Sequence, residues 1–387
     1  MNDTKAAFLL QRSSPLASQS VDTHHTSHLK SESIVVTAAP SPNLSDATAA
    51  LQQSAQDIVR PIDVTAQYQP NSKFAYVTLM HGLDETFKYR GFLYSAIIMK
   101  RLLQRFGSKA DFLVMVGFSR NSVDRRIFET DLGLLNKFGI KVLYLPRLLP
   151  DTDKVSFAEM ALLKITPWSM LHYERVQYFD GDIMPRKNMD AFFNLKLNSF
   201  NTGNASPLNS GWFCAVPNLH LYNYMKGKAV HRLLTPWNED FGWNERIPED
   251  LRFRGTNGAL VKKWTFNGAS LDQGLLTHTL VLNNGSVLLF DIQSATIYQP
   301  HYRAKKTSMK EQLSCCGSIS PIEYFDHFTG LSKPWLPDKK GKTNKLDNPA
   351  VKRWLFELDS LGLDVNSSNI FILGGKPPLG YWYPNKR

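Results

Sequence analysis

The sequence predicts an α/β fold with a mostly parallel sheet, and three observations support this prediction. Short apolar runs of strand composition alternate with amphipathic runs of helical periodicity between Phe74 and Asp182. Glycines follow the helical runs, as expected where helices end. Two carboxylates, Asp180 and Asp182, stand where the last of these apolar runs ends. Strands that alternate with helices are joined by right-handed crossovers and lie parallel in one sheet.

Three segments divide the chain. Residues 1–72 are rich in Ser, Thr, Ala, Gln and His without sustained periodicity, which predicts a disordered N-terminal arm. Residues 73–338 carry the alternating pattern and form the predicted main domain. Residues 339–387 form a C-terminal extension, in which a linker rich in Pro, Lys and Gly precedes an amphipathic helix over 348–361.

Apolar periodicity predicts the elements of the main domain. The first half contains buried strands over 74–80, 112–116 and 140–145, a strand leading to Asp180, and helices over 92–106, 122–138 and 157–171. Pro167 interrupts the last of these helices, because proline lacks the amide that a helix interior needs. The second half contains a short helix at 188–193, a strand at 208–216, an irregular insertion at 234–264, a helix starting at 271 and a strand at 287–291.

The composition is that of a basic protein whose apolar content is usual for a protein with a hydrophobic core. The chain has 387 residues and a net charge of +11, which suits an anionic ligand, a nucleic acid or an acidic membrane surface. No run approaches the roughly 18 to 20 apolar residues of a membrane span. We therefore expect no transmembrane segment and favour a cytoplasmic location. A Golgi location would require a truncated N-terminus, and the N-x-S/T sequons are compatible with it; they start at Asn2, Asn43, Asn204, Asn284 and Asn366.

The acidic pair predicts a ligand site. Side chains at the end of a buried strand point into the crevice where α/β sheets bind ligands. Two carboxylates there repel one another unless a cation lies between them, which favours a divalent metal that holds a diphosphate. An exposed Asp-Gly-Asp turn is the alternative. The chain lacks the Gly-x-Gly-x-x-Gly fingerprint and the Gly-Lys-Ser/Thr loop, so a metal would have to replace them in binding phosphates.

A second group of candidate residues lies far along the chain, in the run from Asp326 to Trp335. His327 offers an imidazole, which Mn²⁺ accepts alongside carboxylates. Gly330 lets a phosphate approach the backbone, and Lys333 can place an ammonium group on a phosphate oxygen. The alternative is that His327 is a structural residue.

These pieces resemble the family 8 glycosyltransferases, the group that contains glycogenin, galactinol synthase and bacterial lipopolysaccharide galactosyltransferases. The matches follow the family's order and cover about residues 74–335. They are Ala75-Tyr76-Val77-Thr78, the segment from Lys164 to Trp168 with Asp180-Gly181-Asp182, Asn209-Ser210-Gly211 with Asp272-Gln273-Gly274, and His327 to Trp335. The last run matches His-x-x-Gly-x-x-Lys-Pro-Trp and is the most specific. The run Met80-His81-Gly82 departs from the polar residues common in the family.

The resemblance implies a GT-A fold, which is a Rossmann-like, mostly parallel mixed sheet flanked by helices, of the nucleotide-diphospho-sugar transferase type. It implies retaining transfer of a hexose from a nucleotide-diphosphate sugar, usually a UDP-sugar, with Mn²⁺ or alternatively Mg²⁺. The implied metal ligands are Asp180, Asp182 and His327. The implied contacts to the donor's diphosphate are Gly330 and Lys333, and Asp180 and Gly181 are further implied donor-binding residues.

The resemblance also assigns the remaining donor contacts and the catalytic residues. Thr78 is expected near the nucleoside, and Asn209 along the donor sugar. Asp272, Gln273 and Lys164 are the expected catalytic residues, with Asp272 or Gln273 nearest the anomeric carbon. The acceptor, a carbohydrate, a polyol or a glycoprotein, cannot be specified, and a homodimer is compatible with the sequence.

Other functions stay open at this point. A nucleotide-sugar pyrophosphorylase would show a Gly-rich, basic signature after the first strand, which is absent. A basic scaffold or nucleic-acid-binding protein would cluster its Lys and Arg residues with exposed aromatic residues, whereas here the charge is scattered, so we expect no nucleic acid. A protein that binds a nucleotide sugar without transferring it is the third alternative.

Overall fold

The computed structural model describes residues 69–81, 89–117, 127–149, 155–203, 206–247, 263–284, 287–290, 297–298, 321–329, 333–336 and 348–363. All of them belong to one compact unit, Ser54–Arg387. The predicted arm lies outside the described residues up to residue 68, and so do most of the predicted linker and the chain after residue 363. The predicted boundaries of the three segments therefore stay predictions.

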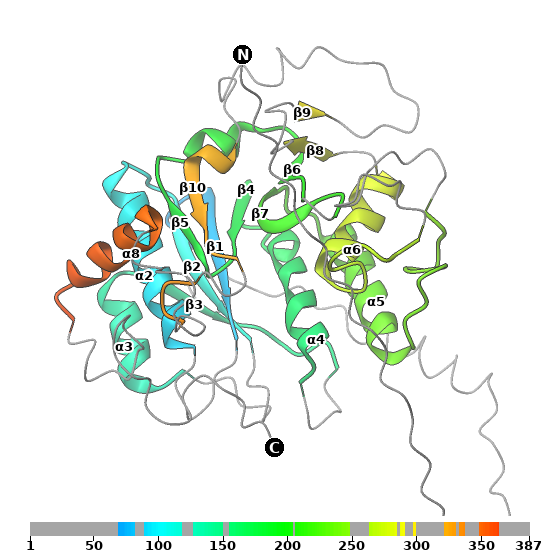
Figure 1. The fold of residues 1–387 in the computed structure, drawn as a ribbon, viewed down its shortest axis with the longest axis horizontal. Helices are drawn as coiled ribbons and strands as arrows, with labels where there is room; N and C mark the ends of the chain where they lie inside the picture. The colour runs from blue at the N-terminus through cyan, green and yellow to red at the C-terminus, as the bar shows by residue number, and fades with distance from the viewer. Residues whose placement is uncertain are drawn as a thin grey trace, which may run out of the picture. The chain divides into compact units, whose positions relative to one another are not determined.

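A mixed sheet lies at the centre of the described residues (Figure 1). Its order is β3-β2-β1-β4-β7-β6-β8-β9. The strands are β1 (Phe74–Met80), β2 (Asp111–Val116), β3 (Lys141–Tyr144), β4 (Arg175–Phe179), β6 (Asn198–Asn201), β7 (Asn209–Ala215), β8 (Val287–Phe290) and β9 (Ile297–Tyr298). Strands β3, β2, β1 and β4 are parallel, β7 runs antiparallel to β4, and β8 is parallel to β6. The prediction of a mostly parallel mixed sheet flanked by helices is confirmed.

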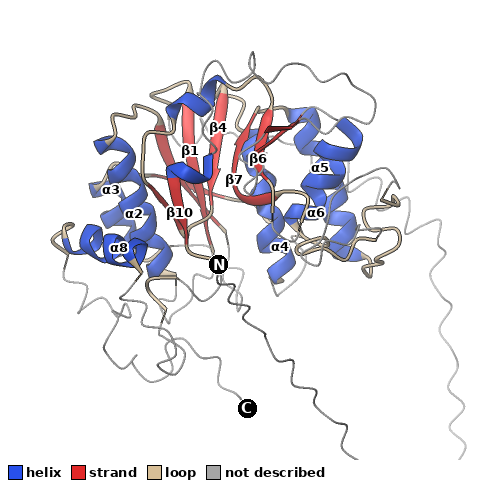
Figure 2. Ribbon diagram, turned by 45° about the horizontal axis from the view of Figure 1, so that its top comes forward, coloured by secondary structure: helices blue, strands red, loops and turns tan. Residues whose placement is uncertain are grey.

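Helices cover both faces of this sheet (Figure 2). One face carries α2 (Arg90–Arg105), α3 (Glu129–Lys137) and α8 (Pro349–Asp359). The other carries α4 (Phe157–Leu162), the 3-10 helix η2 (Leu163–Ser169), α5 (Leu219–Leu234), α6 (Asp272–Leu276) and the π-helix η4 (Thr277–Asn284). Because both faces are covered, β1 sends Val77 into one core and Tyr76 into the other.

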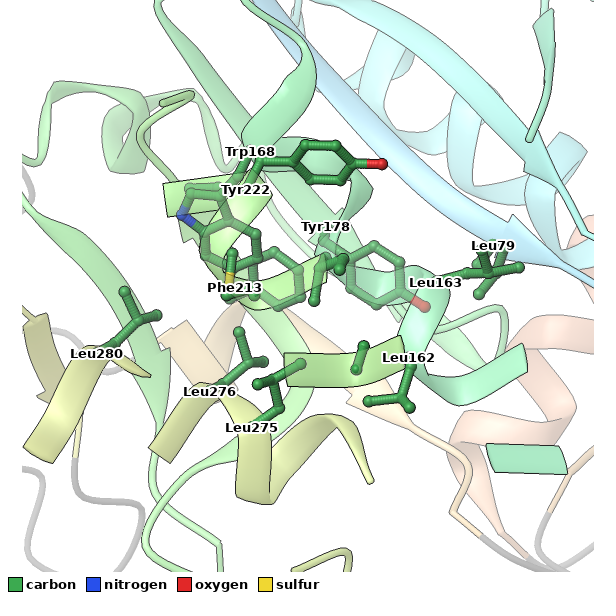
Figure 3. Close-up of a cluster of buried hydrophobic side chains, with 14 of the residues drawn as sticks. Leu79, Leu162, Leu163, Trp168, Tyr178, Phe213, Tyr222, Leu275, Leu276 and Leu280 are labelled. Atoms are coloured by element: carbon green, nitrogen blue, oxygen red, sulfur yellow. The ribbon is translucent and has the colours of Figure 1, made fainter. Parts of the chain in front are cut away.

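Aromatic stacking joins the antiparallel strand β7 to its neighbours in one of these cores (Figure 3). The ring of Phe213 lies 4.8 Å from that of Tyr178 on β4 and 5.1 Å from that of Trp168 on η2. All three side chains are buried. The stack therefore fixes η2, which carries Lys164, against the strand that ends at the acidic pair.

Several element boundaries differ from the sequence-based prediction. The helix expected over 122–138 begins at Glu129, because Phe128 has an extended ψ of 141°; residues 122–126 of that range are among those the structure leaves undescribed. The helix expected over 157–171 is α4 followed by η2, which contains Pro167. The tighter 3-10 turn accommodates the missing amide. The short helix expected at 188–193 is the 3-10 helix η3 (Asp190–Asn194).

A small second sheet brings distant segments together. Strand β10 (Phe325–His327), which follows the 3-10 helix η5 (Pro321–Tyr324), pairs antiparallel with β5 (Ile183–Pro185). The register sets His327 opposite Ile183, one residue after Asp182. The amide of Phe328 donates to the carbonyl of Asp182 at 2.9 Å and extends this pairing. Main-chain hydrogen bonds thus place the second group of candidate residues beside the acidic pair.

The helix of the C-terminal extension packs against α2. Asn348 caps it, with its side-chain oxygen accepting from the amide of Ala350 at 2.9 Å. Arg105 pairs with Glu357 at 2.5 Å, and the indole of Trp354 donates to Ser95 at 3.0 Å. Among the described residues, no helix combines the length and the apolar character that crossing a membrane requires.

Candidate functional site

The acidic pair lies in a tight turn directly after β4. The amide of Asp180 donates to the carbonyl of Gly211 at 2.7 Å, and the amide of Ile183 donates to the carbonyl of Asp180 at 3.0 Å. A Cβ on Gly181 would lie 2.6 Å from the ring of Phe92, so this position requires glycine. Asp182 is only 6% exposed. The alternative of an exposed Asp-Gly-Asp turn is therefore wrong.

His327 completes a cluster with the two carboxylates. Its Nε2 lies 3.2 Å from Oδ1 of Asp182 and 3.9 Å from Oδ2 of Asp180. One ligand atom from each residue can be chosen so that all three lie within 4.8 Å of one another. A Cβ on Gly211 would lie 2.4 Å from Cε1 of His327, so the absence of a side chain on β7 leaves room for the imidazole.

The two measured separations in this cluster are compatible with a six-coordinate divalent cation. Metal–ligand bonds of roughly 2.1 Å place neighbouring octahedral ligand atoms roughly 3 Å apart and opposite ones roughly 4.2 Å apart. The separations of 3.2 and 3.9 Å around Nε2 of His327 fall within that range. Two carboxylates and one imidazole are ligands that Mn²⁺ accepts. Asp180, Asp182 and His327 could therefore hold such an ion.

Lys333 pairs with the buried member of the acidic pair. Its Nζ lies 2.5 Å from Oδ2 of Asp182 and 3.4 Å from the carbonyl of Phe328. Burial raises the pKa of Asp182, but the hydrogen bond from His327 and the charges of His327 and Lys333 outweigh it and lower the pKa to about 2. Asp182 is therefore a carboxylate at neutral pH. Gly330 lies outside the described residues.

Lys164 joins the acidic pair to Asp272. Its Nζ lies 2.7 Å from Oδ1 of Asp180 and 3.0 Å from Oδ2 of Asp272, and Ser210 donates to the same Asp272 oxygen at 2.6 Å. Burial lowers the pKa of Lys164, but the charges of both aspartates outweigh it, so the pKa is raised. Lys164 therefore carries a fixed positive charge between two carboxylates.

Sequence reasoning missed two side chains of this network, Tyr178 and Ser210. The hydroxyl of Tyr178 donates to Oδ1 of Asp180 at 3.0 Å. A signal for Tyr178 existed, because residues two apart on a strand share a face and Tyr178 stands two before Asp180. Ser210 lies inside the Asn209-Ser210-Gly211 motif, but its pairing with Asp272 depends on how β7 packs against α6.

The other predicted residues lie near this cluster or on strands that lead to it. Asn209 accepts from the amide of Gly211 at 2.7 Å, beside His327. Gln273 accepts from Ser206 at 2.7 Å. Thr78 is buried on β1 opposite Phe179 of β4, and its hydroxyl lacks a hydrogen-bond partner in the described structure. The roles expected for these residues stay predictions.

Two curated proteins of Arabidopsis thaliana match the chain, although no family model does. "Putative UDP-glucuronate:xylan alpha-glucuronosyltransferase 3" is 22% identical over 272 residues, which are 68% of this chain and 35% of that protein. "Inositol phosphorylceramide glucuronosyltransferase 1" is 28% identical over 161 residues, which are 41% of this chain and 27% of that protein. The chain thus matches about a third or less of each relative's length.

Solved structures also match. The galactosyltransferase LgtC, in complex with donor and acceptor sugar analogues, is 11% identical, with a TM-score of 0.39 over 74% of this chain and 95% of that one. The glycosyltransferase GlyE of Streptococcus pneumoniae is 13% identical, with a TM-score of 0.39 over 78% of this chain and 66% of that one.

The mixed sheet, with an acidic pair directly after β4, is the arrangement expected from the sequence resemblance. The motifs in their order resemble those of glycosyltransferase family 8, and the two curated relatives that match the chain are named glucuronosyltransferases.

Proposed function

We propose that this domain is a retaining glycosyltransferase that moves a hexose from a UDP-sugar to an acceptor hydroxyl with the help of a divalent cation. One observation carries the proposal. Side chains as far apart in the chain as Asp182 and Lys333, which are separated by 151 positions, meet in one cluster of carboxylate, imidazole and ammonium groups. Such a cluster suits a metal–diphosphate ligand better than it suits a purely structural role.

Asp180, Asp182 and His327 would hold the cation, which when bound would neutralise charge on the diphosphate leaving group. The chain's own residues supply the rest. Lys333 pairs with Asp182, and the flexible four-carbon stem of a lysine would let its ammonium group pass from Asp182 to a phosphate oxygen. This movement of the ammonium group places a positive charge beside the diphosphate, where negative charge grows as the bond between sugar and diphosphate breaks.

The contacts of Asp272 suit a residue that orients the donor sugar better than one that attacks it as a nucleophile. Asp272 is 5% exposed, and Oδ2 already accepts from Lys164 and Ser210. A carboxylate paired in this way is a weakened nucleophile, which favours attack by the acceptor from the face of the leaving group. Gln273, whose Oε1 accepts from Ser206, would offer its amide to the sugar. In this proposal Lys164 orients Asp272 relative to Asp180.

The relatives suggest which donors to compare. Both are named glucuronosyltransferases, and one name specifies UDP-glucuronate. A hexuronate donor would add a carboxylate to the ligand, which the basic chain, with its net charge of +11, would attract. UDP-glucuronate therefore belongs in the donor panel beside UDP-glucose and UDP-galactose.

The test is a donor-hydrolysis panel with the full chain, with and without Mn²⁺. We expect one UDP-sugar to be hydrolysed faster with Mn²⁺ than without it, and Asp182→Asn to remove that gain while the far-UV circular dichroism spectrum stays unchanged. Binding of UDP without turnover of any donor would favour the nucleotide-sugar-binding alternative. Full activity of Asp182→Asn would reject the metal assignment.

A further inference from the structure

Helix α8 contacts the small sheet that carries His327. Arg353 lies on α8, and its Nη2 donates to Oδ2 of Asp326 at 2.6 Å and to the carbonyl of Pro185 at 3.4 Å. Asp326 immediately precedes His327 on β10, and Pro185 ends β5, the strand that starts directly after Asp182. One guanidinium therefore joins both strands of the antiparallel pair that presents the imidazole. Arg186 adds a longer contact to Asp326, at 3.6 Å.

The next residue of α8 contacts the segment that carries Lys333. The ring of Trp354 lies 5.5 Å from that of Trp335, which lies 5.1 Å from that of Phe92. Phe92 in turn packs against Gly181, between the two aspartates. Trp335 is fully buried, two residues after Lys333. The path from α8 through these rings therefore reaches both the lysine and the acidic turn.

Independent contacts hold α8 itself in place. Arg105 of α2 pairs with Glu357, and Arg101 of α2 donates to the carbonyl of Ser360 at 2.7 Å. The indole of Trp354 donates to Ser95, also on α2. These contacts involve neither β10 nor the segment around Lys333. They give α8 a fixed position from which Arg353 and Trp354 can act.

We propose that α8, in the segment expected to be an extension, is a positioning element of the active site. Arg353 sets His327 through Asp326, so that the imidazole reaches the proposed metal site, and Trp354 sets the segment of Lys333 through Trp335, so that the ammonium group lies within reach of both Asp182 and a phosphate. The inference rests on the proposed metal-dependent function. Groups that hydrogen-bond to metal ligands change metal affinity by about 10–100-fold when they are lost, and Arg353 acts one residue away from His327, through Asp326, so we expect an effect at the lower end of that range.

The test compares two arginines that both hold α8. In the full chain, Arg353→Ala, Arg353→Lys and Arg105→Ala are each measured for the dissociation constant of Mn²⁺, by electron paramagnetic resonance of the free ion, and for the urea midpoint. We expect Arg353→Ala to weaken Mn²⁺ binding about tenfold and Arg353→Lys to recover part of the loss. Arg105→Ala should lower the urea midpoint without changing Mn²⁺ binding.

Whether Mn²⁺ binds more weakly or more tightly in Arg353→Ala distinguishes the placement of His327 from the loss of the arginine charge. Loss of a positive charge beside Asp326 would by itself strengthen the binding of a cation, so weaker binding in Arg353→Ala reports the placement of His327. Asp326→Asn should also weaken binding, but it removes a negative charge as well, so the coupling is measured by the double variant, which should bind no more weakly than Asp326→Asn alone. These substitutions leave the packing of the buried Trp354 unchanged, so we expect the variants to stay folded.

The outcomes also distinguish this inference from the proposed function. If the wild-type chain binds no Mn²⁺, or Asp182→Asn binds it equally well, both are overturned. If the wild-type chain binds Mn²⁺ and Asp182→Asn does not, but Arg353→Ala binds as the wild type does, only the positioning role is overturned. Equal weakening by Arg105→Ala and Arg353→Ala would reduce α8 to a structural support and overturn the inference as well.

Discussion

The Nζ of Lys333 lies 2.5 Å from Oδ2 of Asp182, while Oδ1 of the same carboxylate faces Nε2 of His327 at 3.2 Å. Both oxygens of a proposed metal ligand are thus engaged by positively charged or polar groups of the protein. In the proposed function, Lys333 gives up this contact when a diphosphate arrives. Cation and diphosphate would then each favour the binding of the other.

The variant Lys333→Met tests this exchange. Without the competing ammonium group, Mn²⁺ alone should bind several-fold more tightly. UDP in the presence of Mn²⁺ should bind about tenfold more weakly, because a charge-assisted contact to phosphate contributes roughly 1.5 kcal/mol or more. Isothermal titration calorimetry measures both constants. Lys352→Met, at an exposed lysine of α8, is the matched control. If the dissociation constants of Mn²⁺ and of UDP change in the same direction, Lys333 does not exchange Asp182 for the phosphate.

Lys164→Met should lower the free energy of unfolding. The substitution leaves Asp180 and the buried Asp272 without their shared cation, and breaking a buried pair costs on the order of 3 kcal/mol. The double variant Lys164→Met/Asp272→Asn should regain part of that loss, because the uncompensated charge is gone. Urea unfolding followed by tryptophan fluorescence measures Lys164→Met, Asp272→Asn and the double variant. Strictly additive losses would show that the pair is not coupled.

Gly211→Ala should displace the imidazole of His327. The added Cβ would lie 2.4 Å from Cε1 of His327 and 2.8 Å from Oδ1 of Asn209. We expect Mn²⁺ to bind at least tenfold more weakly, as when the partners of metal ligands are lost. Gly227→Ala on α5 is the control, since nothing lies within 4 Å of its added Cβ, and it should stabilise the helix by about 0.5–1 kcal/mol. Unchanged Mn²⁺ affinity in Gly211→Ala would remove His327 from the ligand set.

The stability of the fold should decrease as the pH falls below neutrality, through His278 on the π-helix. Burial and the charge of Lys228 lower its pKa to about 4, despite the contact of its Nδ1 with Glu245 at 3.0 Å. An unfolded histidine titrates near 6.5, so the unfolded chain binds more protons between pH 6.5 and 4. Stability is therefore complete above that range and decreases as the pH falls through it.

The matching experiment is urea unfolding of the wild type and His278→Gln at pH 7 and pH 5. The wild type should lose up to about 2 kcal/mol more than the variant between these pH values, since one pKa unit corresponds to about 1.4 kcal/mol. An equal loss in both proteins would mean that His278 does not titrate in this way.

Much of the fold could be predicted from local pattern. The strand at 74–80 and the helix over 92–106 follow from apolar periodicity, because residues that share a face must share an environment. The start of α3 at Glu129 and the 3-10 form of η2 could not be predicted. Both depend on where the chain must turn to reach its neighbour in space, and periodicity does not carry that information.

By itself the sequence determined the order of the elements and the residue types at the ends of the strands, and its motifs indicated the family. Only the tertiary structure decided which side chains meet: Lys164 with both Asp180 and Asp272, Lys333 with Asp182, and Arg353 with Asp326. The physical reason is that residues near in sequence share a helix or strand geometry. Contacts across 151 positions depend instead on strand register and on which faces the helices cover.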